Sequence, residues 1–519
     1  MGVSVLNPGG ILRSTLPLPT LSNANAVTGL ILAGYVLRIV LAGSVGFGTD
    51  ESYTVANARH LAWSYVDYPP LHVWLVWATA HFSGSEAPVV LRLPFIAMFA
   101  ASTWLMFRLT AFLFGEAAGV WSTMLFNLAP VFTFAHASWV LPDGPLAFLM
   151  LSGGLAIAHL LFDGERPSHS YCGWIAAGAL AGLAMLTKYH GAFLIAGTFA
   201  YLVSTGKGRE ALKHPAPWLG VFVAIALFLP VVFWNVHHDG AGLFFQTRRL
   251  TTAPHLSLSR VLSGIVEQSL YLTPWLFLPL GVSLAVALAH GSSRSRFLVC
   301  LAIGPIVLFT VANGVARGLP HWPMPGWLFA FPLLGAEAAR FATMRPRFLR
   351  IASISAAGLL LTLVAVAGTE ARTGWIADRL PLADRHLDPT LDLVDWGELR
   401  SIIADRHLID DKTGAVAALS WFEAGKINYA IGKNISVLCL CADPQEFRYL
   451  HDPGAFVGKN VLVISSSKDI VNHKVELSSR FARIEALPPV VLHRAGRPAI
   501  ELILIRGIAL KNQNIMVGR

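Results

Sequence analysis

The sequence predicts a polytopic α-helical membrane protein with about eleven transmembrane helices, followed by a C-terminal extracytoplasmic α/β domain. Of the 519 residues, 55% are hydrophobic and only 13% are charged, and the mean hydropathy is +0.58. A soluble globular protein does not have this composition. Apolar runs of near-spanning length recur as far as position 368, and shorter strand-like and helix-like segments alternate after it. We therefore divide the chain into a membrane domain, 1–368, and a C-terminal domain, 369–519.

Eleven apolar runs define the membrane domain, although several are shorter than the ~20 residues that a full span needs. They are Val27–Val45, Val89–Leu113, Gly119–Ala135, Leu146–Phe162, Trp174–Leu186, Ala192–Val203, Trp218–Trp234, Ile265–Ala289, Phe297–Ala312, Gly326–Gly335 and Ile351–Gly368. The first is predicted to be a retained span, because little positive charge precedes it as it would in a signal peptide. Leu71–Phe82 is too short and too rich in Trp and His for a span, so we expect an interfacial or re-entrant helix.

Basic residues predict the orientation of these spans. The most basic short loops of the membrane domain contain Lys207, Arg209 and Lys213, then Arg294 and Arg296, then Arg340, Arg345, Arg347 and Arg350. With a cytoplasmic N-terminus all three loops lie inside, as the positive-inside rule requires. The same placement accounts for the net charge of +9 without nucleic acid as a partner. The large first outer loop, 46–88, and the C-terminal domain then lie outside.

Polar and titratable side chains gather on the predicted outer face. They are Asp50, Glu51, Asp67, His136, Asp143, Lys188, His190, Arg248, Arg249, Arg317 and His321. Ionisable groups at a membrane boundary are costly unless they are paired or used, and a purely structural arrangement predicts no such sorting. We therefore expect a functional site on the extracytoplasmic side.

The pair Asp50-Glu51 lies just after the first span, where carboxylates are otherwise rare. A carboxylate in this place can act as a general base or can orient a hydroxyl group. The alternative is structural: Thr49 or Asp50 caps a helix and Glu51 favours its first turn. The two interpretations are compatible.

Two further acidic residues lie beside prolines. Asp67 and Tyr68 precede Pro69-Pro70, which predicts a rigid turn leading into the short helix from Leu71. Asp143 lies between Pro142 and Pro145, with His136 about two turns earlier, and its expected partners are cations on the same side. A plain turn and a capped helix start are the structural alternatives for these two motifs.

Cations and aromatic residues complete the predicted site. Lys188 and His190 lie at a helix end, and Arg248 and Arg249 lie in a long outer loop, where they suit a phosphate group or, alternatively, lipid head groups. His321 and Trp322 belong to a proline-rich aromatic turn that can line a groove. The histidines on this face, His136, His190, His237, His238 and His321, have no strong ligand spacing, so a divalent metal stays open. Cys439 and Cys441 share one face of a predicted strand without further metal ligands nearby.

Several of these motifs occur in a familiar order. Asp50-Glu51, Asp67-Tyr68-Pro69-Pro70, Arg92-Leu93-Pro94, Pro142-Asp143, the segment ending at Lys188, and His321-Trp322 with Pro325 follow one another along the chain. In this order they resemble the GT-C glycosyltransferases of the protein-mannosyltransferase and aminoarabinose-transferase group, glycosyltransferase families 39 and 83. The resemblance covers about Val27 to Gly335, and the first loop is its specific part.

The resemblance implies a function. Such enzymes move a sugar from a polyprenyl-phosphate donor to lipid A, lipopolysaccharide core or protein, on the periplasmic face of the bacterial inner membrane. By similarity, Asp50 is the leading catalytic carboxylate and Asp143 the second acidic position, with Glu51 beside them. Asp67, Tyr68, His136, Lys188, His190, Arg248, Arg249, His321 and Trp322 are then the expected substrate-binding residues.

One position departs from the aminoarabinose transferases. These enzymes have a lysine just before the first proline of the turn, whereas this chain has Tyr68. Phosphate binding would then depend on Lys188, Arg248 or Arg249, and donors carrying uronic acids or hexoses fit better than aminoarabinose. A protein O-mannosyltransferase-type enzyme is one alternative. A lipid or sugar transporter is another, but transporters commonly contain internal repeats and titratable groups at mid-membrane, and neither is found in this sequence.

Overall fold

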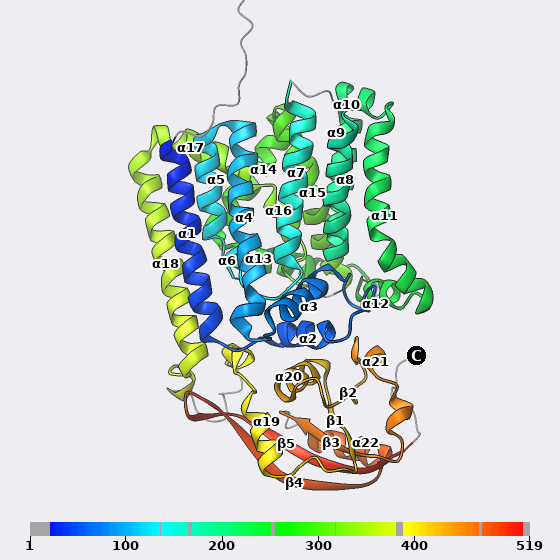
Figure 1. Ribbon diagram of the computed structural model, residues 1–519. Coiled ribbons are helices and arrows are strands. Elements are labelled where there is room, and N and C mark those ends of the chain that lie inside the picture. Colours follow the sequence, from blue (N-terminus) through cyan, green and yellow to red (C-terminus); the bar gives the residue numbers. More distant parts are fainter. Residues whose placement is uncertain are drawn as a thin grey trace, which may run out of the picture.

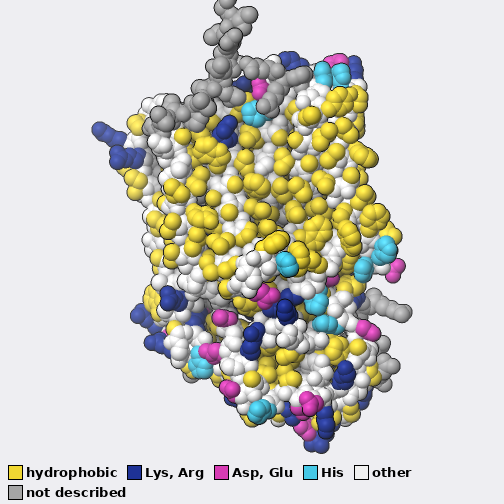
Figure 2. All heavy atoms as spheres, in the orientation of Figure 1, with side chains coloured by type: hydrophobic (Ala, Val, Ile, Leu, Met, Phe, Trp, Pro, Cys, Tyr) yellow, Lys and Arg dark blue, Asp and Glu magenta, His cyan; other side chains and the backbone are white. Residues whose placement is uncertain are grey.

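The computed structural model describes residues 21–134, 136–164, 169–250, 255–316, 318–379, 388–466 and 470–511. A bundle of roughly parallel helices forms the upper part of the molecule, and the C-terminal domain lies below one end of it (Figure 1). Hydrophobic side chains cover the visible face of the bundle, while charged and His side chains gather at its ends and over the lower domain (Figure 2). This distribution is the one expected of a bundle surrounded by lipid.

Six helices in the described part of the chain are long and apolar enough to cross a membrane. They are α1 (Leu21–Ser44), α4 (Pro88–Phe114), α7 (Asp143–Phe162), α11 (Pro215–His237), α15 (Ser293–Val315) and α18 (Pro346–Thr373). The pair α13 (Leu258–Leu272) and α14 (Pro274–His290), bent by 111°, gives a seventh span if it is taken as one. The polytopic helical class is confirmed, and the count of about eleven stays a prediction.

Shorter helices fill the bundle between these spans. They are α5 (Glu116–Leu128), α6 (Pro130–Thr133), α8 (Tyr171–Thr187), η1 (Tyr189–Gly191), α9 (Ala192–Ser204), α10 (Gly206–Ala211), α16 (Met324–Leu328) and α17 (Phe331–Met344). The predicted run Gly119–Ala135 is broken, because Pro130 cannot donate the helical hydrogen bond that would join α5 to α6. Glycine allows the closest packing: a Cβ on Gly178 of α8 would lie 2.0 Å from the carbonyl oxygen of Gly220 in α11.

Three helices lie where the bundle meets the C-terminal domain: α2 (Thr49–Ala58), α3 (Leu71–Ser83) and α12 (Ala241–Leu250) (Figure 1). α3 is the short helix predicted from Leu71. The basic helix α10 and the junction of α17 with α18 lie at the opposite end of the bundle (Figure 1). The acidic first loop and these basic segments are thus well separated, and which end faces the cytoplasm stays a prediction.

The C-terminal domain is built on a five-stranded sheet in the order β2-β1-β3-β5-β4. β1 (Thr413–Ala418) pairs in parallel with β2 (Val437–Cys439) and β3 (Asn460–Ser465), and β5 (Arg497–Leu510) is antiparallel to β3 and β4 (Phe481–Arg494). Alternate strand residues enter two cores, one facing α20 (Trp421–Ile431) and the other α22 (Ile470–Arg480). The remaining helical elements are η2 (Ala377–Arg379), η4 (Pro389–Leu393), α19 (Glu398–Asp405), α21 (Phe447–Leu450) and η5 (Pro453–Phe456).

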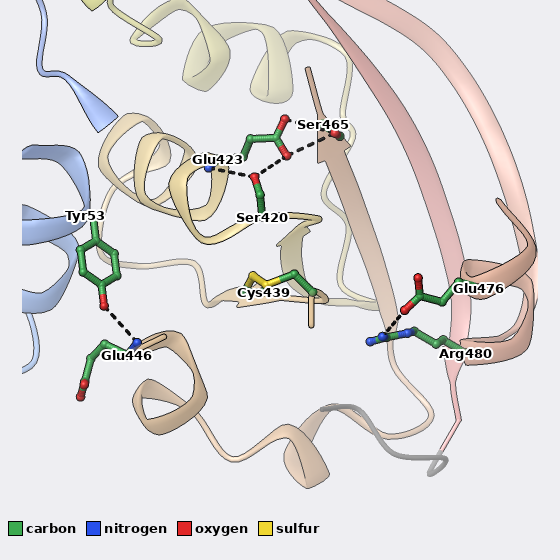
Figure 3. The surroundings of a disulfide bond; sticks show 9 residues. Tyr53, Ser420, Glu423, Cys439, Glu446, Ser465, Glu476 and Arg480 are labelled. Atoms are coloured by element: carbon green, nitrogen blue, oxygen red, sulfur yellow. Dashed lines mark hydrogen bonds and ion pairs between the residues drawn. A yellow bond between two sulfur atoms is a disulfide. The ribbon is translucent and has the colours of Figure 1, made fainter. Parts of the chain in front are cut away.

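The predicted α/β domain is therefore present, with a correction at its cysteines. Cys439 and Cys441 form a disulfide at the end of β2, although the sequence was expected to give no disulfide framework (Figure 3). The shared strand face that brings them together is the one expected from their spacing of two. The predicted boundary after position 368 falls within the last turns of α18, which ends at Thr373.

The C-terminal domain packs directly on the first outer loop. Tyr53 and Ala56 of α2 are buried in the same hydrophobic core as residues of α20 and the sheet. Gly425 of α20 makes this possible, because a Cβ there would lie 2.9 Å from the backbone nitrogen of Tyr53. The Tyr53 hydroxyl accepts a hydrogen bond from the Glu446 backbone N–H at 3.0 Å (Figure 3). Loop and domain thus form one packed unit.

Candidate active site

Asp50 is exposed in the first turn of α2, at the junction with the C-terminal domain. Gly48 is the residue that caps this helix, and it has no side chain to do so. The capping oxygen comes from Asp392, whose Oδ1 accepts hydrogen bonds from the backbone N–H of Thr49 at 2.9 Å and from the Thr49 hydroxyl. A Cβ on Gly48 would lie 2.7 Å from Asp392 Oδ2, so glycine leaves room for the carboxylate. The predicted helix start is correct, but its cap was expected from Thr49 or Asp50.

Glu51 has a different environment from Asp50. Its carboxylate is buried and accepts hydrogen bonds from Arg92 Nε at 2.8 Å, Arg92 Nη2 at 2.5 Å, the Gly48 N–H at 2.9 Å and the Val140 N–H at 3.0 Å. Arg92 also donates to the carbonyl oxygens of residues 42, 45 and 46. Each carboxylate oxygen already accepts two hydrogen bonds, so the expected catalytic role of Glu51 does not fit its environment. Glu51 instead joins the ends of α1, α2 and α4.

The Asp67-Tyr68 turn is held from two sides. Glu446 of the C-terminal domain accepts a hydrogen bond from the Val66 N–H at 2.7 Å, and Gln246 of α12 donates to the Asp67 carbonyl oxygen at 2.7 Å. Burial raises the pKa of Glu446 well above its usual value, and the nearby charge of Asp67 acts in the same direction. The predicted rigid turn therefore exists, and a second domain holds it in place.

Asp143 pairs with the cation that the sequence suggested. Lys188 Nζ lies 2.9 Å from Asp143 Oδ1, and both side chains are buried. His136 Nε2 lies 3.9 Å from the same oxygen, and His321 is close enough to interact with it electrostatically. Asp143 is also the first residue of α7, as the structural alternative predicted. A buried pair of this kind needs both partners, because either charge alone is strongly destabilising.

Lys188 lines a cavity of about 280 Å³ beside the turn. Its walls are formed by Asp67, Tyr68, Lys188, Tyr189, His190, Ala192, Phe193, Leu243, Gln246, Leu308, Phe309 and Trp322. The imidazole of His190 stacks on Phe309 with ring centroids 4.5 Å apart, and its Nε2 is buried without a hydrogen-bond partner among the described residues. The lining thus combines a cation and an imidazole with apolar and aromatic side chains, which suits an anionic group attached to an apolar chain.

The structure does not bring all the predicted residues into this cavity. Asp67, Tyr68, Lys188, His190 and Trp322 line it, whereas Asp50, His136, Asp143 and His321 do not. Arg248 is exposed on α12 and is also outside its lining. The side chain of Arg249 and the whole of Arg317 lie outside the described residues. Within the described ranges, no group of three His, Cys, Asp or Glu side chains is placed to hold a metal ion.

Several residues at the site carry no local sequence signal. Lys426 of α20 donates hydrogen bonds to the carbonyl oxygens of Phe47 and Asp392, and to that of Val394 at 3.3 Å. Burial lowers the pKa of Lys426 to about 8. Asp392 and Glu446 reach the first loop from more than 340 positions away in the chain. Only the fold of the C-terminal domain brings these groups to the loop.

Comparisons with known proteins agree with this architecture. Residues 67–234 match the family described as dolichyl-phosphate-mannose-protein mannosyltransferase. The fold matches the crystal structure of ArnT from Cupriavidus metallidurans in the apo state, with a TM-score of 0.62 over 94% of this chain and 98% of that one, at 15% identity. The family match thus covers about a third of the chain, and the structural match covers nearly all of it. At 94% coverage of this chain, the structural match includes the C-terminal domain.

Two relatives are similar in sequence. The lipid A galacturonosyltransferase RgtD of Rhizobium johnstonii is 26% identical over 310 residues, which is 58% of this chain and 63% of RgtD. The lipopolysaccharide core galacturonosyltransferase RgtB of the same organism is 25% identical over 360 residues, covering 64% and 70% of the two chains. The alignment thus spans less than two thirds of RgtD. The undecaprenyl-phosphate-bound form of ArnT matches with a TM-score of 0.58 over 95% and 98% of the chains, at 16% identity.

Proposed function

We propose that this protein transfers a sugar from a polyprenyl-phosphate donor to a hydroxyl group of lipid A or lipopolysaccharide core, on the periplasmic face of the inner membrane. The observation that carries the proposal is the buried Lys188, paired with Asp143, in the wall of a cavity that combines polar groups with apolar and aromatic side chains. A lipid-linked phosphate needs such a cation as the glycosidic bond breaks, and its chain needs apolar walls. The names of the relatives RgtD and RgtB favour galacturonic acid as the sugar.

The proposed reaction gives Asp50 and Lys188 one role each. The oxygen of the acceptor hydroxyl attacks the anomeric carbon of the donor sugar. Asp50, at the exposed start of α2, accepts the proton that this hydroxyl loses. The bond from that carbon to the phosphate oxygen breaks, and its electron pair leaves with the polyprenyl phosphate. Lys188 stabilises the charge that appears on the phosphate. A single displacement of this kind inverts the anomeric configuration.

The extracytoplasmic location has two supports. The acidic first loop and the basic segments lie at opposite ends of the bundle, as the positive-inside rule expects (Figure 1). The disulfide Cys439–Cys441 belongs to the domain that contacts the first loop, and disulfides persist in oxidising compartments such as the periplasm.

The test uses purified full-length protein, undecaprenyl-phosphate galacturonic acid and lipid A, with the products analysed by mass spectrometry. We expect one added hexuronosyl residue with the wild type and none with Asp50→Asn, which keeps the size of the side chain. Thr390→Val is a control, because Thr390 lies in η4 of the C-terminal domain and contacts Asp388 and Arg494 rather than α2. Sugar transfer by Asp50→Asn at the wild-type rate would show that Asp50 is not the catalytic base.

The family match to protein mannosyltransferases makes a protein acceptor the second candidate, to be tested by glycoprotein analysis of a deletion strain.

A further inference from the structure

A second cavity, of about 820 Å³, lies between the first outer loop and the C-terminal domain. One wall comes from the end of α2, from α3 and from the turn at residues 84–86. The other comes from Arg400 of α19, from the last residue of α20, Ile431, and from residues 432–435 after it. It shares no lining residue with the cavity that contains Lys188. Its volume is in the range of about 300–1,000 Å³ that is typical of ligand sites. We call it the interdomain groove.

The domain side of the groove carries positive charge. Arg400 and Lys433 are exposed, and neither forms an ion pair with a described residue. Arg400 is nonetheless held in place, because its Nε donates to the Ala430 carbonyl oxygen at 3.1 Å. Its guanidinium packs on Gly432, which has a φ of +88°, and a Cβ there would lie 2.8 Å from Nη2. A fixed guanidinium beside a lysine is suited to binding phosphate or carboxylate.

The acidic residue of the groove does not cancel this charge. Glu86 is paired with Arg59, with Nη2 and Oε2 2.6 Å apart, and a second bond joins Arg59 Nε to Oε1 at 3.2 Å. Arg59 also donates to the Asn428 side-chain oxygen at 2.7 Å. Arg59 and Glu86 therefore form a closed, neutral wall, and the net charge of the groove comes from Arg400 and Lys433.

The membrane side of the groove is apolar and aromatic. Trp77 and His81, one turn apart on α3, stack with ring centroids 5.0 Å apart and an interplanar angle of 12°. Val76 and Ala80 of the same helix also line the groove. Charged side chains of both signs and His side chains gather along the boundary between the apolar belt and the lower domain (Figure 2). A groove that is apolar toward the bundle and cationic toward the domain is complementary to an amphiphile with an anionic head.

The helix α2 connects this groove to the proposed catalytic carboxylate. Ala58, at the end of α2, lines the groove, and Asp50 lies eight residues earlier in its first turn. At a rise of 1.5 Å per residue this separation is about 12 Å. The groove is too far from Asp50 to hold the reacting hydroxyl, but it is within reach of another part of the same large acceptor.

We propose that the interdomain groove binds a phosphate or carboxylate of the acylated glycolipid acceptor, at a distance from the hydroxyl that receives the sugar. This assignment rests on the proposed function, because it takes the acceptor to be a glycolipid. Arg400 and Lys433 contact the anionic group, and Trp77 and His81 pack against the sugar ring or acyl chain. The groove thus selects acceptors by their charge before transfer takes place.

The experiment measures binding without donor, so that it does not depend on turnover. Full-length protein in nanodiscs of neutral lipid is titrated with diphosphoryl lipid A and, separately, with its dephosphorylated form. We expect the wild type to prefer the diphosphoryl form at least tenfold. Arg400→Gln/Lys433→Gln should lose that preference. The matched control is Lys412→Gln/Lys511→Gln, which removes the same charge from exposed positions outside the groove.

The possible outcomes separate this proposal from the proposed function. Unchanged lipid A binding by Arg400→Gln/Lys433→Gln would overturn the groove assignment and leave the transferase proposal intact. If Arg400→Gln/Lys433→Gln loses lipid A binding while the wild type transfers no sugar, the groove assignment is supported and the transferase proposal is rejected. If phosphatidylglycerol competes equally with lipid A for the wild-type groove, the site binds bilayer head groups and the acceptor assignment is overturned. Size-exclusion chromatography of each variant verifies that it is folded.

Discussion

Asp392 Oδ1 accepts a hydrogen bond from the Thr49 backbone N–H at 2.9 Å, across 343 positions of sequence. The C-terminal domain therefore supplies the cap of the helix on which Asp50 lies. Lys426 of the same domain donates to the carbonyl oxygens of Phe47 and Asp392, on either side of this contact. The domain is thus part of the structure that positions the proposed base, and not only a cover for it.

Replacing Asp392 by Ala should lower the transfer rate more than it lowers stability. A lost helix cap costs about 1 kcal/mol, whereas a small displacement of a catalytic group can reduce the rate about a hundredfold. We expect kcat to fall at least tenfold with a small change in Tm. Asp392→Asn keeps an acceptor oxygen and should recover part of the rate. Equal rates for the Ala variant and the wild type would contradict a positioning role.

Glu51 should behave as a structural residue, in contrast to Asp50. Removing one partner of a buried ion pair costs about 3–5 kcal/mol, so Glu51→Ala and Arg92→Ala should both yield little folded protein. Asp50→Ala, at an exposed position, should fold normally and lack activity. Thermal unfolding in detergent measures the difference. A Glu51→Ala protein as stable as the wild type would show that the ion pair is dispensable.

Local patterns in the sequence were sufficient to predict much of the fold. The alternation of strands and helices after position 368 agrees with prediction, because apolar periodicity and strand composition are properties of neighbouring residues. The disulfide was not predicted, although the spacing of two correctly placed both cysteines on one strand face. The sequence could not distinguish the exposed Asp50 from the buried Glu51. That difference depends on Arg92, which lies 41 positions from Glu51.

No local sequence pattern indicated the contacts between the first loop and the C-terminal domain. Asp392 and Glu446 are single acidic residues in an ordinary domain, and nothing near them in the sequence marks them as partners of the first loop. The glycine at the N-cap of α2, Gly48, has no side chain to cap the helix, which is one indirect indication that the capping group comes from elsewhere. The identity of that group follows only from the packing of α20 on α2.

Glu446 should make stability fall as pH rises above about 4.5. Burial, together with Asp67 nearby, raises its pKa well above the usual 4.5, and the Val66 N–H and the buried Tyr53 face it from the loop. Between the unfolded and the folded pKa the folded state binds the extra proton, so stability declines by up to about 1.4 kcal/mol per pH unit. Glu446→Gln cannot ionise. Its Tm should exceed that of the wild type increasingly between pH 5 and 8, whereas parallel Tm curves would refute this assignment.

Lys188 should be required for donor binding even when the protein remains folded. Lys188→Met alone leaves Asp143 buried without its partner and should be unstable, by about 3–5 kcal/mol. The double variant Lys188→Met/Asp143→Asn removes both charges and should recover the fold. Because the cavity then lacks its cation, undecaprenyl phosphate should bind at least tenfold more weakly and transfer should be lost. Lys188→Arg keeps the charge and serves as the matched control. Recovery of transfer together with the fold in the double variant would exclude Lys188 as the phosphate-binding group.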